Sequence, residues 1–155
     1  IALAAAIPAI GVSAFAAIAT AVPGAALAGR ALAVAIDTKR GDVYLQVFDE
    51  ARRPLGLGRV AGVDEIAALL PRGPLHVAGD GAALVAEALA DDSRDVSWAG
   101  DRAPPDAAAV AALGAELLQA ARRAGTPLPP AEPLYLRAPE ATPLALQGKQ
   151  RERGR

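Results

Sequence analysis

The sequence has no cysteine and no methionine, and few aromatic residues: one tryptophan, two tyrosines and two phenylalanines in 155 residues. The absence of cysteine excludes a disulfide framework and a thiolate metal site. The net charge of −1 excludes a basic surface spread over the whole chain, which many nucleic-acid-binding domains use to contact phosphate. Because a natural reading frame begins with methionine, we expect that Ile1 is not the native start and that further sequence lies upstream.

Charged side chains are also missing from residues 1–29. A membrane-spanning helix needs about 20 consecutive apolar residues. Alanine is the commonest residue of this run, and no basic residues precede it as they would in a secretory signal. The run is also interrupted by Pro8, Gly11, Ser13 and the Pro23-Gly24 pair. We therefore predict a buried segment of a cytoplasmic protein and no membrane span.

The pattern of apolar and turn residues predicts an α/β domain, with short strands first and apolar residues at helical spacing later. In chain order we expect an edge strand at 7–12, a helix from Ser13 to Val22, a β-hairpin of strands 32–36 and 43–48, and a weak third strand at 55–60. After these come a helix at 64–70, a strand at 75–78, a helix carrying Leu84, Val85 and Leu89, and a strand at 96–98. A long helix, opened by Pro104-Pro105-Asp106 and ended by Gly125, and an extended segment at 134–137 follow.

This order, three antiparallel strands followed by alternating helices and strands, is that of a ribonuclease H-like lobe, the unit duplicated in actin-like ATPases and sugar kinases. We therefore divide the chain into a remnant of a second, N-terminal lobe with an inter-lobe helix at residues 1–29, a C-terminal ribonuclease H-like lobe at 30–146, and a basic, disordered tail at 147–155. The order of elements indicates a fold and, by itself, no function.

Three aspartates raise the question of a metal site, because ribonuclease H-like nucleases hold two metal ions with several carboxylates, one of them on the first strand. Asp37 ends the first hairpin strand, and Asp42 and Asp49 follow. Asp37 and Asp42 also flank a turn, where aspartate often accepts hydrogen bonds from the local backbone. The later elements add no carboxylate at an inward position except Asp80. We interpret Asp37 and Asp42 as turn residues and predict neither a metal site nor a catalytic residue.

A second candidate is Gly79-Asp80-Gly81, between a predicted strand and a helix N-terminus, where backbone N–H groups can contact the phosphate of a nucleotide. No lysine or hydroxyl residue follows as in a P-loop, so we favour a tight connection with Asp80 as the helix cap. His76 is the only histidine and lies in a predicted strand, where a packed, hydrogen-bonded residue is commoner than a catalytic base.

Two further features concern surfaces. Lys39 and Arg40 lie in the hairpin loop and could meet a phosphate backbone, although a solvated loop is the alternative we favour. The apolar start, from Ile1 to Val22, has to be covered by something, either upstream sequence of the same chain or a helix of a partner.

Four segments occur in the order of a known family. They are Ile7-Pro8-Ala9-Ile10-Gly11-Val12-Ser13, then Ala35-Ile36-Asp37-Thr38-Lys39-Arg40-Gly41-Asp42-Val43-Tyr44, then Pro104-Pro105-Asp106-Ala107 at the start of the long helix, and finally Pro133-Leu134-Tyr135-Leu136-Arg137. Together they resemble the TsaB (YeaZ) family of bacterial tRNA threonylcarbamoyladenosine biosynthesis proteins, over about Ile1 to Pro143. The family's opening strand and glycine-rich segment have no counterpart, and Thr38 stands where the family often has alanine.

The resemblance implies two actin-like lobes that lack the catalytic equipment of their superfamily. Such proteins bind the related catalytic subunit TsaD, mainly through helices of the N-terminal lobe. With the ATPase TsaE they support transfer of threonylcarbamoyl to adenosine 37 of tRNA. ATP or ADP and metal are expected on TsaD and TsaE, and no cofactor in this chain. Peptidase activity, suggested by the older M22 glycopeptidase naming, is not expected.

The sequence therefore predicts a non-catalytic scaffold or dimerization subunit, with TsaD, TsaE or a second copy as partner and tRNA reached only through the complex. Ile1, Leu3 and Phe15 are predicted partner contacts, because they lie beside the missing lobe. Lys39 and Arg40 are weaker candidates for a tRNA or partner surface. Two alternatives are an ATP-binding, kinase-like lobe with phosphate at Gly79 to Gly81, and a nuclease that depends on Asp37.

Overall fold

A β-hairpin lies at the centre of the sheet. The structure, a computed structural model, describes residues 7–99, 105–128 and 131–137. Strands β1 (Ala31–Asp37) and β2 (Asp42–Phe48) pair antiparallel, with Ile36 opposite Tyr44. The predicted hairpin is confirmed, and each strand ends within one residue of its predicted bounds.

Three shorter strands complete the sheet, whose order is β3-β2-β1-β4-β5. β3 (Arg59–Gly62) pairs antiparallel with β2, while β4 (Leu75–Ala78) and β5 (Val96–Trp98) extend the sheet in parallel from β1. β4 and β5 lie where the sequence predicts them. The third strand begins later than predicted, at Arg59, because residues 55–58 form a loop that is held by other contacts.

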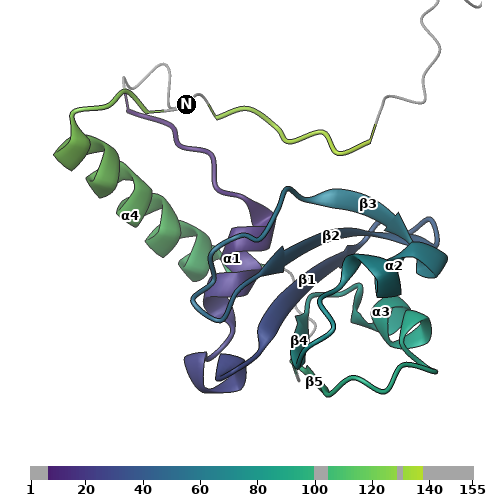
Figure 1. Cartoon of the computed structure of the whole chain (residues 1–155). Coiled ribbons are helices and arrows are strands. Elements are labelled where there is room, and N and C mark those ends of the chain that lie inside the picture. The colour runs from purple at the N-terminus through teal and green to yellow at the C-terminus, as the bar shows by residue number, and fades with distance from the viewer. Residues whose placement is uncertain (1–6, 100–104, 129–130, 138–155) are drawn as a thin grey trace, which may run out of the picture.

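Helices cover both faces of this sheet (Figure 1). α2 (Val63–Leu69) and α3 (Ala82–Ala88) lie on one face, and α1 (Ala14–Ala21) with a 3₁₀ turn (Gly24–Leu27) lies on the other. Successive side chains of β1 therefore enter two different cores, and Leu32, Ala33, Val34 and Ala35 are all fully buried. A strand covered on both faces has a continuous apolar run rather than an alternating one, and residues 31–36 are such a run.

The longest helix, α4 (Ala107–Ala124), packs against α1 and stands apart from the sheet (Figure 1). The Asp106 carboxylate accepts a hydrogen bond of 3.1 Å from the Ala108 N–H at its start, and Gly125, at φ 63°, ends it. The predicted N-terminal and C-terminal signals of this helix are therefore confirmed.

Residues 7–13 run beside α4, close enough that a side-chain carbon at Gly114 would lie 3.5 Å from Ile10 and 3.6 Å from Val12. The predicted edge strand at 7–12 is wrong. In the described part of the chain this segment has a helix and Ala131 as neighbours instead of a strand, so its backbone has no ladder to join.

The result is a mixed α/β fold with a five-stranded sheet and helices on both faces. Among the described residues, no helix combines the length and the apolar character needed to cross a membrane. Ile1, Leu3 and the predicted tail at 147–155 lie outside the described residues, as do Pro104 and the last nine residues of the predicted lobe, 138–146.

Candidate functional site

The β1–β2 turn holds the Lys39 candidate in place through Asp37. One carboxylate oxygen of Asp37 accepts the Lys39 backbone N–H at 2.6 Å, and the other lies 2.8 Å from Lys39 Nζ. Lys39 has φ 61° and Gly41 has φ 82°, and these two left-handed residues reverse the chain. The hydrogen bonds from the Lys39 side chain and backbone lower the pKa of Asp37. These are the local bonds that the turn interpretation of Asp37 predicts.

The Gly79–Asp80–Gly81 segment packs directly against the end of β1. The Gly81 N–H donates to the Ala35 carbonyl at 3.0 Å. Gly79 has φ 103°, and a side-chain carbon there would lie 2.1 Å from the same carbonyl oxygen. Glycine is therefore required at position 79 both for its backbone angle and for the close approach of two chain segments.

Asp80 crosses to the turn instead of capping α3. Its Oδ1 accepts the Asp37 N–H at 2.9 Å, and its Oδ2 lies 3.5 Å from Lys39 Nζ. The N-cap of α3 is Gly81, with no side-chain cap. The prediction of Asp80 as a helix cap is therefore wrong. We call the group of Asp37, Lys39 and Asp80 the turn clamp.

The turn clamp uses its own donors internally, so they are not available to a phosphate. The N–H of Asp37 points to Asp80, the N–H of Lys39 points to Asp37, and the Lys39 amine lies between the two carboxylates. Two fixed negative charges also repel an anion. The predicted residues do come together in space, but they form an internal connection between β1 and the start of α3.

On the other side of the same turn, Asp42 binds Arg137. The Arg137 guanidinium forms an ion pair with the Asp42 carboxylate, which also accepts the Thr38 hydroxyl. These two contacts, the Thr38 hydrogen bond first, lower the pKa of Asp42. We call this pair the Asp42–Arg137 latch. The sequence alone predicts no role for Arg137, although both partners belong to segments of the family pattern.

Asp49, the third candidate ligand, lies at the opposite end of β2. Its carboxylate accepts the Arg53 N–H at 2.8 Å and the Arg53 Nε–H at 2.7 Å. The three aspartates of the candidate set therefore do not converge. Across residues 7–99, 105–128 and 131–137, no group of three histidine, cysteine or acidic side chains is arranged to hold a metal.

His76 and Phe15 are both packed inside the protein, with 4% of each residue exposed. His76 Nδ1 lies 2.8 Å from the Ser97 hydroxyl, and burial lowers the pKa of the imidazole, which favours its neutral form. The Phe15 ring is so close to Gly58 that a side-chain carbon there would lie 2.8 Å from it. Phe15 thus has a core position here, whereas Lys39 and Arg40 lie on the exposed turn.

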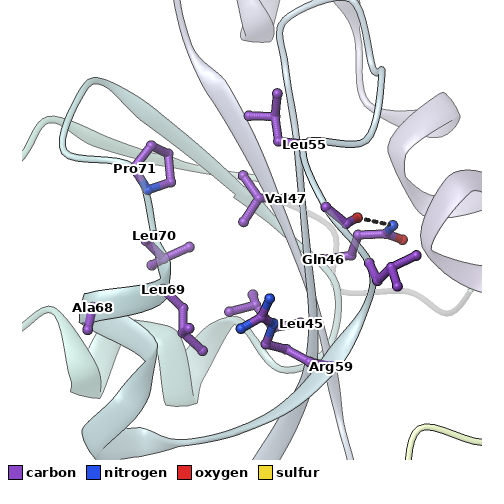
Figure 2. A pocket seen from close by; sticks show the side chains of 11 residues that line it. Leu45, Gln46, Val47, Leu55, Arg59, Ala68, Leu69, Leu70 and Pro71 are labelled. Atoms are coloured by element: carbon purple, nitrogen blue, oxygen red, sulfur yellow. Dashed lines mark hydrogen bonds between the residues drawn. The ribbon is translucent and has the colours of Figure 1, made fainter.

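Two apolar hollows border β2. The first, of about 580 Å³, lies next to the Asp42–Arg137 latch, between residues 11–15 and 132–137, and Ile36 and Tyr44 also line it. The second, of about 390 Å³, lies at the far end of β2 and is lined by that strand, the loop at 55–57 and the end of α2 (Figure 2). The apolar side chains in both linings provide surface for contact with another molecule.

No family model matches the sequence, and no curated protein matches it. Two solved structures from Pseudomonas aeruginosa do match the fold. One is an uncharacterized protein with similarity to peptidase YeaZ, with a TM-score of 0.63, 21% identity, and coverage of 88% of this chain and 62% of that one. The other is YeaZ, with a TM-score of 0.63, 22% identity, and coverage of 87% and 62%. The chain thus shares the fold of YeaZ and spans less than two thirds of its length.

Proposed function

We propose that this chain is a TsaB-like, non-catalytic scaffold subunit that binds TsaD and supports threonylcarbamoyl transfer to adenosine 37 of tRNA in the cytoplasm. The observation that carries the proposal is the Asp42–Arg137 latch in a YeaZ-like fold. Two separate segments of the TsaB pattern, the hairpin and the Leu-Tyr-Leu-Arg ending, meet in space through one ion pair.

The polar groups of the candidate site support a structural role. Asp37, Lys39 and Asp80 bind one another, and Asp42 binds Thr38 and Arg137. Each of these charges is paired with another group of the same chain, so the site has a fixed shape and little reactivity. A subunit of this kind contributes by positioning a partner, in this proposal TsaD with its bound metal and nucleotide.

The turn clamp and the separation of the aspartates argue against the two enzyme alternatives. A kinase-like lobe needs backbone N–H groups available to phosphate at Gly79 to Gly81, where the Gly81 N–H is bonded to the Ala35 carbonyl and the Asp80 carboxylate repels an anion. A nuclease needs converging carboxylates, and Asp49 lies a full strand away from Asp42. The ribonuclease H-like lobe remains the fold to which we assign residues 30–146.

The test is reconstitution with the full-length protein. Purified TsaD, TsaE, ATP, threonine, bicarbonate and the enzyme that makes threonylcarbamoyl-adenylate are mixed with tRNA, and incorporation of labelled threonine is followed. We expect incorporation only when this protein is added, and a stable complex with TsaD by calorimetry. A protein that neither binds TsaD nor supports incorporation would refute the proposal. Mg²⁺-dependent cleavage of RNA that is lost in Asp37→Asn would instead favour the nuclease.

A further inference from the structure

The second hollow exists because β2 is longer than its outer partner. β3 pairs only with residues 42–45 of β2, so β2 from Gln46 to Phe48 has the loop at 54–58 beside it instead of a strand. The loop and the last turn of α2 diverge there, and Val47, Leu69 and Leu70 line the space between them (Figure 2). The sheet therefore has an apolar notch at one corner.

The loop beside the notch displays two leucines to solvent. Leu55 is 60% exposed and Leu57 is 87% exposed. Isolated exposed leucines are common and need no explanation. These two, however, lie within three residues of each other and adjoin an apolar hollow, so together they extend one continuous apolar surface.

The loop is held firmly, so this exposure is a fixed feature of the fold. The Leu55 N–H donates to the Val47 carbonyl at 2.9 Å, and the Gln46 side-chain amide donates to the Gly56 carbonyl at 2.9 Å (Figure 2). Gly58 then packs against the Phe15 ring. Because three anchors fix five residues, ordering this surface on binding costs little further entropy.

One charge borders the notch. Arg59, at the start of β3, is the only ionisable residue among those that line it. Within the described part of the chain its side chain makes no hydrogen bond and no ion pair, whereas the nearby Arg53 is bound to Asp49. An exposed cation beside an apolar hollow selects a partner that brings an apolar side chain and a carboxylate together.

The size of the notch favours a short segment over a second copy of this chain. The 11 residues that line it are fewer than the roughly 20–30 residues a side of a standard protein interface. We infer that this corner of the sheet, with Leu55, Leu57 and Arg59 at its rim, binds an extended segment of another protein that presents bulky apolar residues next to an acidic one. This inference does not depend on the proposed role with TsaD.

The test uses two blocked synthetic peptides that differ in one charge, Gly-Ser-Leu-Glu-Leu-Ser-Gly and the same peptide with lysine in place of glutamate. Each is titrated into the ¹⁵N-labelled full chain, and amide shifts are followed by NMR. We expect the glutamate peptide to shift the amides of Val47, Gly56 and Leu57, and the lysine peptide to bind about ten-fold more weakly because its charge opposes that of Arg59.

Two variants locate the effect. Arg59→Glu should reverse the preference between the peptides, while Arg123→Glu, the same change at an exposed arginine of α4, should leave it unchanged. Leu57→Asp should abolish binding with the fold intact, since that side chain is exposed. Equal binding of both peptides, shifts confined to other residues, or no shifts at millimolar concentration would overturn the inference. Equal shifts with octanoate at a lower concentration would also overturn it, because the notch would then be a fatty-acid site.

Discussion

The two ends of β2 are finished in opposite ways. At its start, Asp42 lies in a network in which Thr38, Arg137 and the turn clamp use nearly every charged group. At its end, the strand extends beyond its neighbour β3 and leaves an apolar notch with exposed leucines and an arginine that has no partner among the described residues. One end is closed by partners within the chain, and the other presents groups that a second molecule could satisfy.

The difference teaches which part of such a fold is available for contacts. A charge that is already hydrogen-bonded inside the protein gains little from a new partner, because the old bond has to be broken first. Exposed apolar surface held on a fixed loop has no such cost. The charged residues at the start of β2 are the ones that the sequence marks as candidates, although the apolar surface at the end of β2 is more available for binding.

The largest effect is expected at the closed end, from Gly79→Ala. The new side-chain carbon would lie 2.1 Å from the Ala35 carbonyl oxygen at a φ of 103°, so β1 and the start of α3 must move apart. We expect a loss of about 3 kcal/mol or more in the free energy of unfolding, measured in urea.

Gly41→Ala is the matched control for Gly79→Ala. Gly41 has a positive φ of 82°, and a side-chain carbon added there would have no atom within 4 Å. Only the strain of the backbone angle therefore remains, and we expect the free energy of unfolding to fall by about 1 kcal/mol. Equal losses in the two variants would show that the close approach of the glycine turn to β1 is unimportant.

The second comparison is between two leucines that line the notch. Leu45→Ala removes a side chain buried in the core and should cost about 2–5 kcal/mol. Leu57→Ser changes a side chain that is 87% exposed, and the free energy of unfolding should change by less than about 0.5 kcal/mol. Both are measured by urea unfolding. A large loss for Leu57→Ser would mean that the loop is structural, and that its exposed surface is not free for a partner.

The smallest effect is expected at the Asp42–Arg137 latch, because both side chains are partly solvated. Asp42→Asn should lower the unfolding temperature at pH 7. The pKa of Asp42 is lowered in the folded state, so the contribution of its charge is present above the ordinary value of 3.8 and is lost as the pH falls through the folded-state pKa.

Thermal unfolding at a series of pH values therefore separates the latch from a general effect of charge. The difference in unfolding temperature between wild type and Asp42→Asn should become smaller below pH 3.8. Asp91→Asn, at an exposed aspartate after α3, is the control and should have nearly the unfolding temperature of wild type at every pH. A difference for Asp42→Asn that persists at the lowest pH would show that the charge is not what stabilises the turn.

Much of the fold follows from local sequence. The hairpin is predicted because Gly41 supplies the turn and the apolar run of β1 requires cover on both faces. Two errors arise where tertiary contacts decide. Residues 7–12 have the composition of a strand but lie against α4, and β3 begins late because Gly58 is needed against Phe15. Neither contact can be predicted from the local spacing of apolar residues.

The sequence predicts which residues form the candidate site, but not which hydrogen bonds these residues make. Lys39 and the Gly79–Asp80–Gly81 segment stand out in the sequence, and the fold does bring them together. That Asp80 reaches across to β1 depends on the parallel pairing of β4 with β1, which sets its distance from Asp37. The notch was missed entirely, because it results from the unequal lengths of two strands.

The latch also constrains the order in which the molecule assembles. It joins residues that are 95 positions apart in the chain, so during synthesis on the ribosome the hairpin exists long before Arg137 emerges. The hairpin and its parallel neighbours must therefore be able to form with the Asp42 carboxylate still in water. An ion pair that closes last hardly changes the rate of folding and instead slows the first step of unfolding, so the latch keeps a finished protein closed.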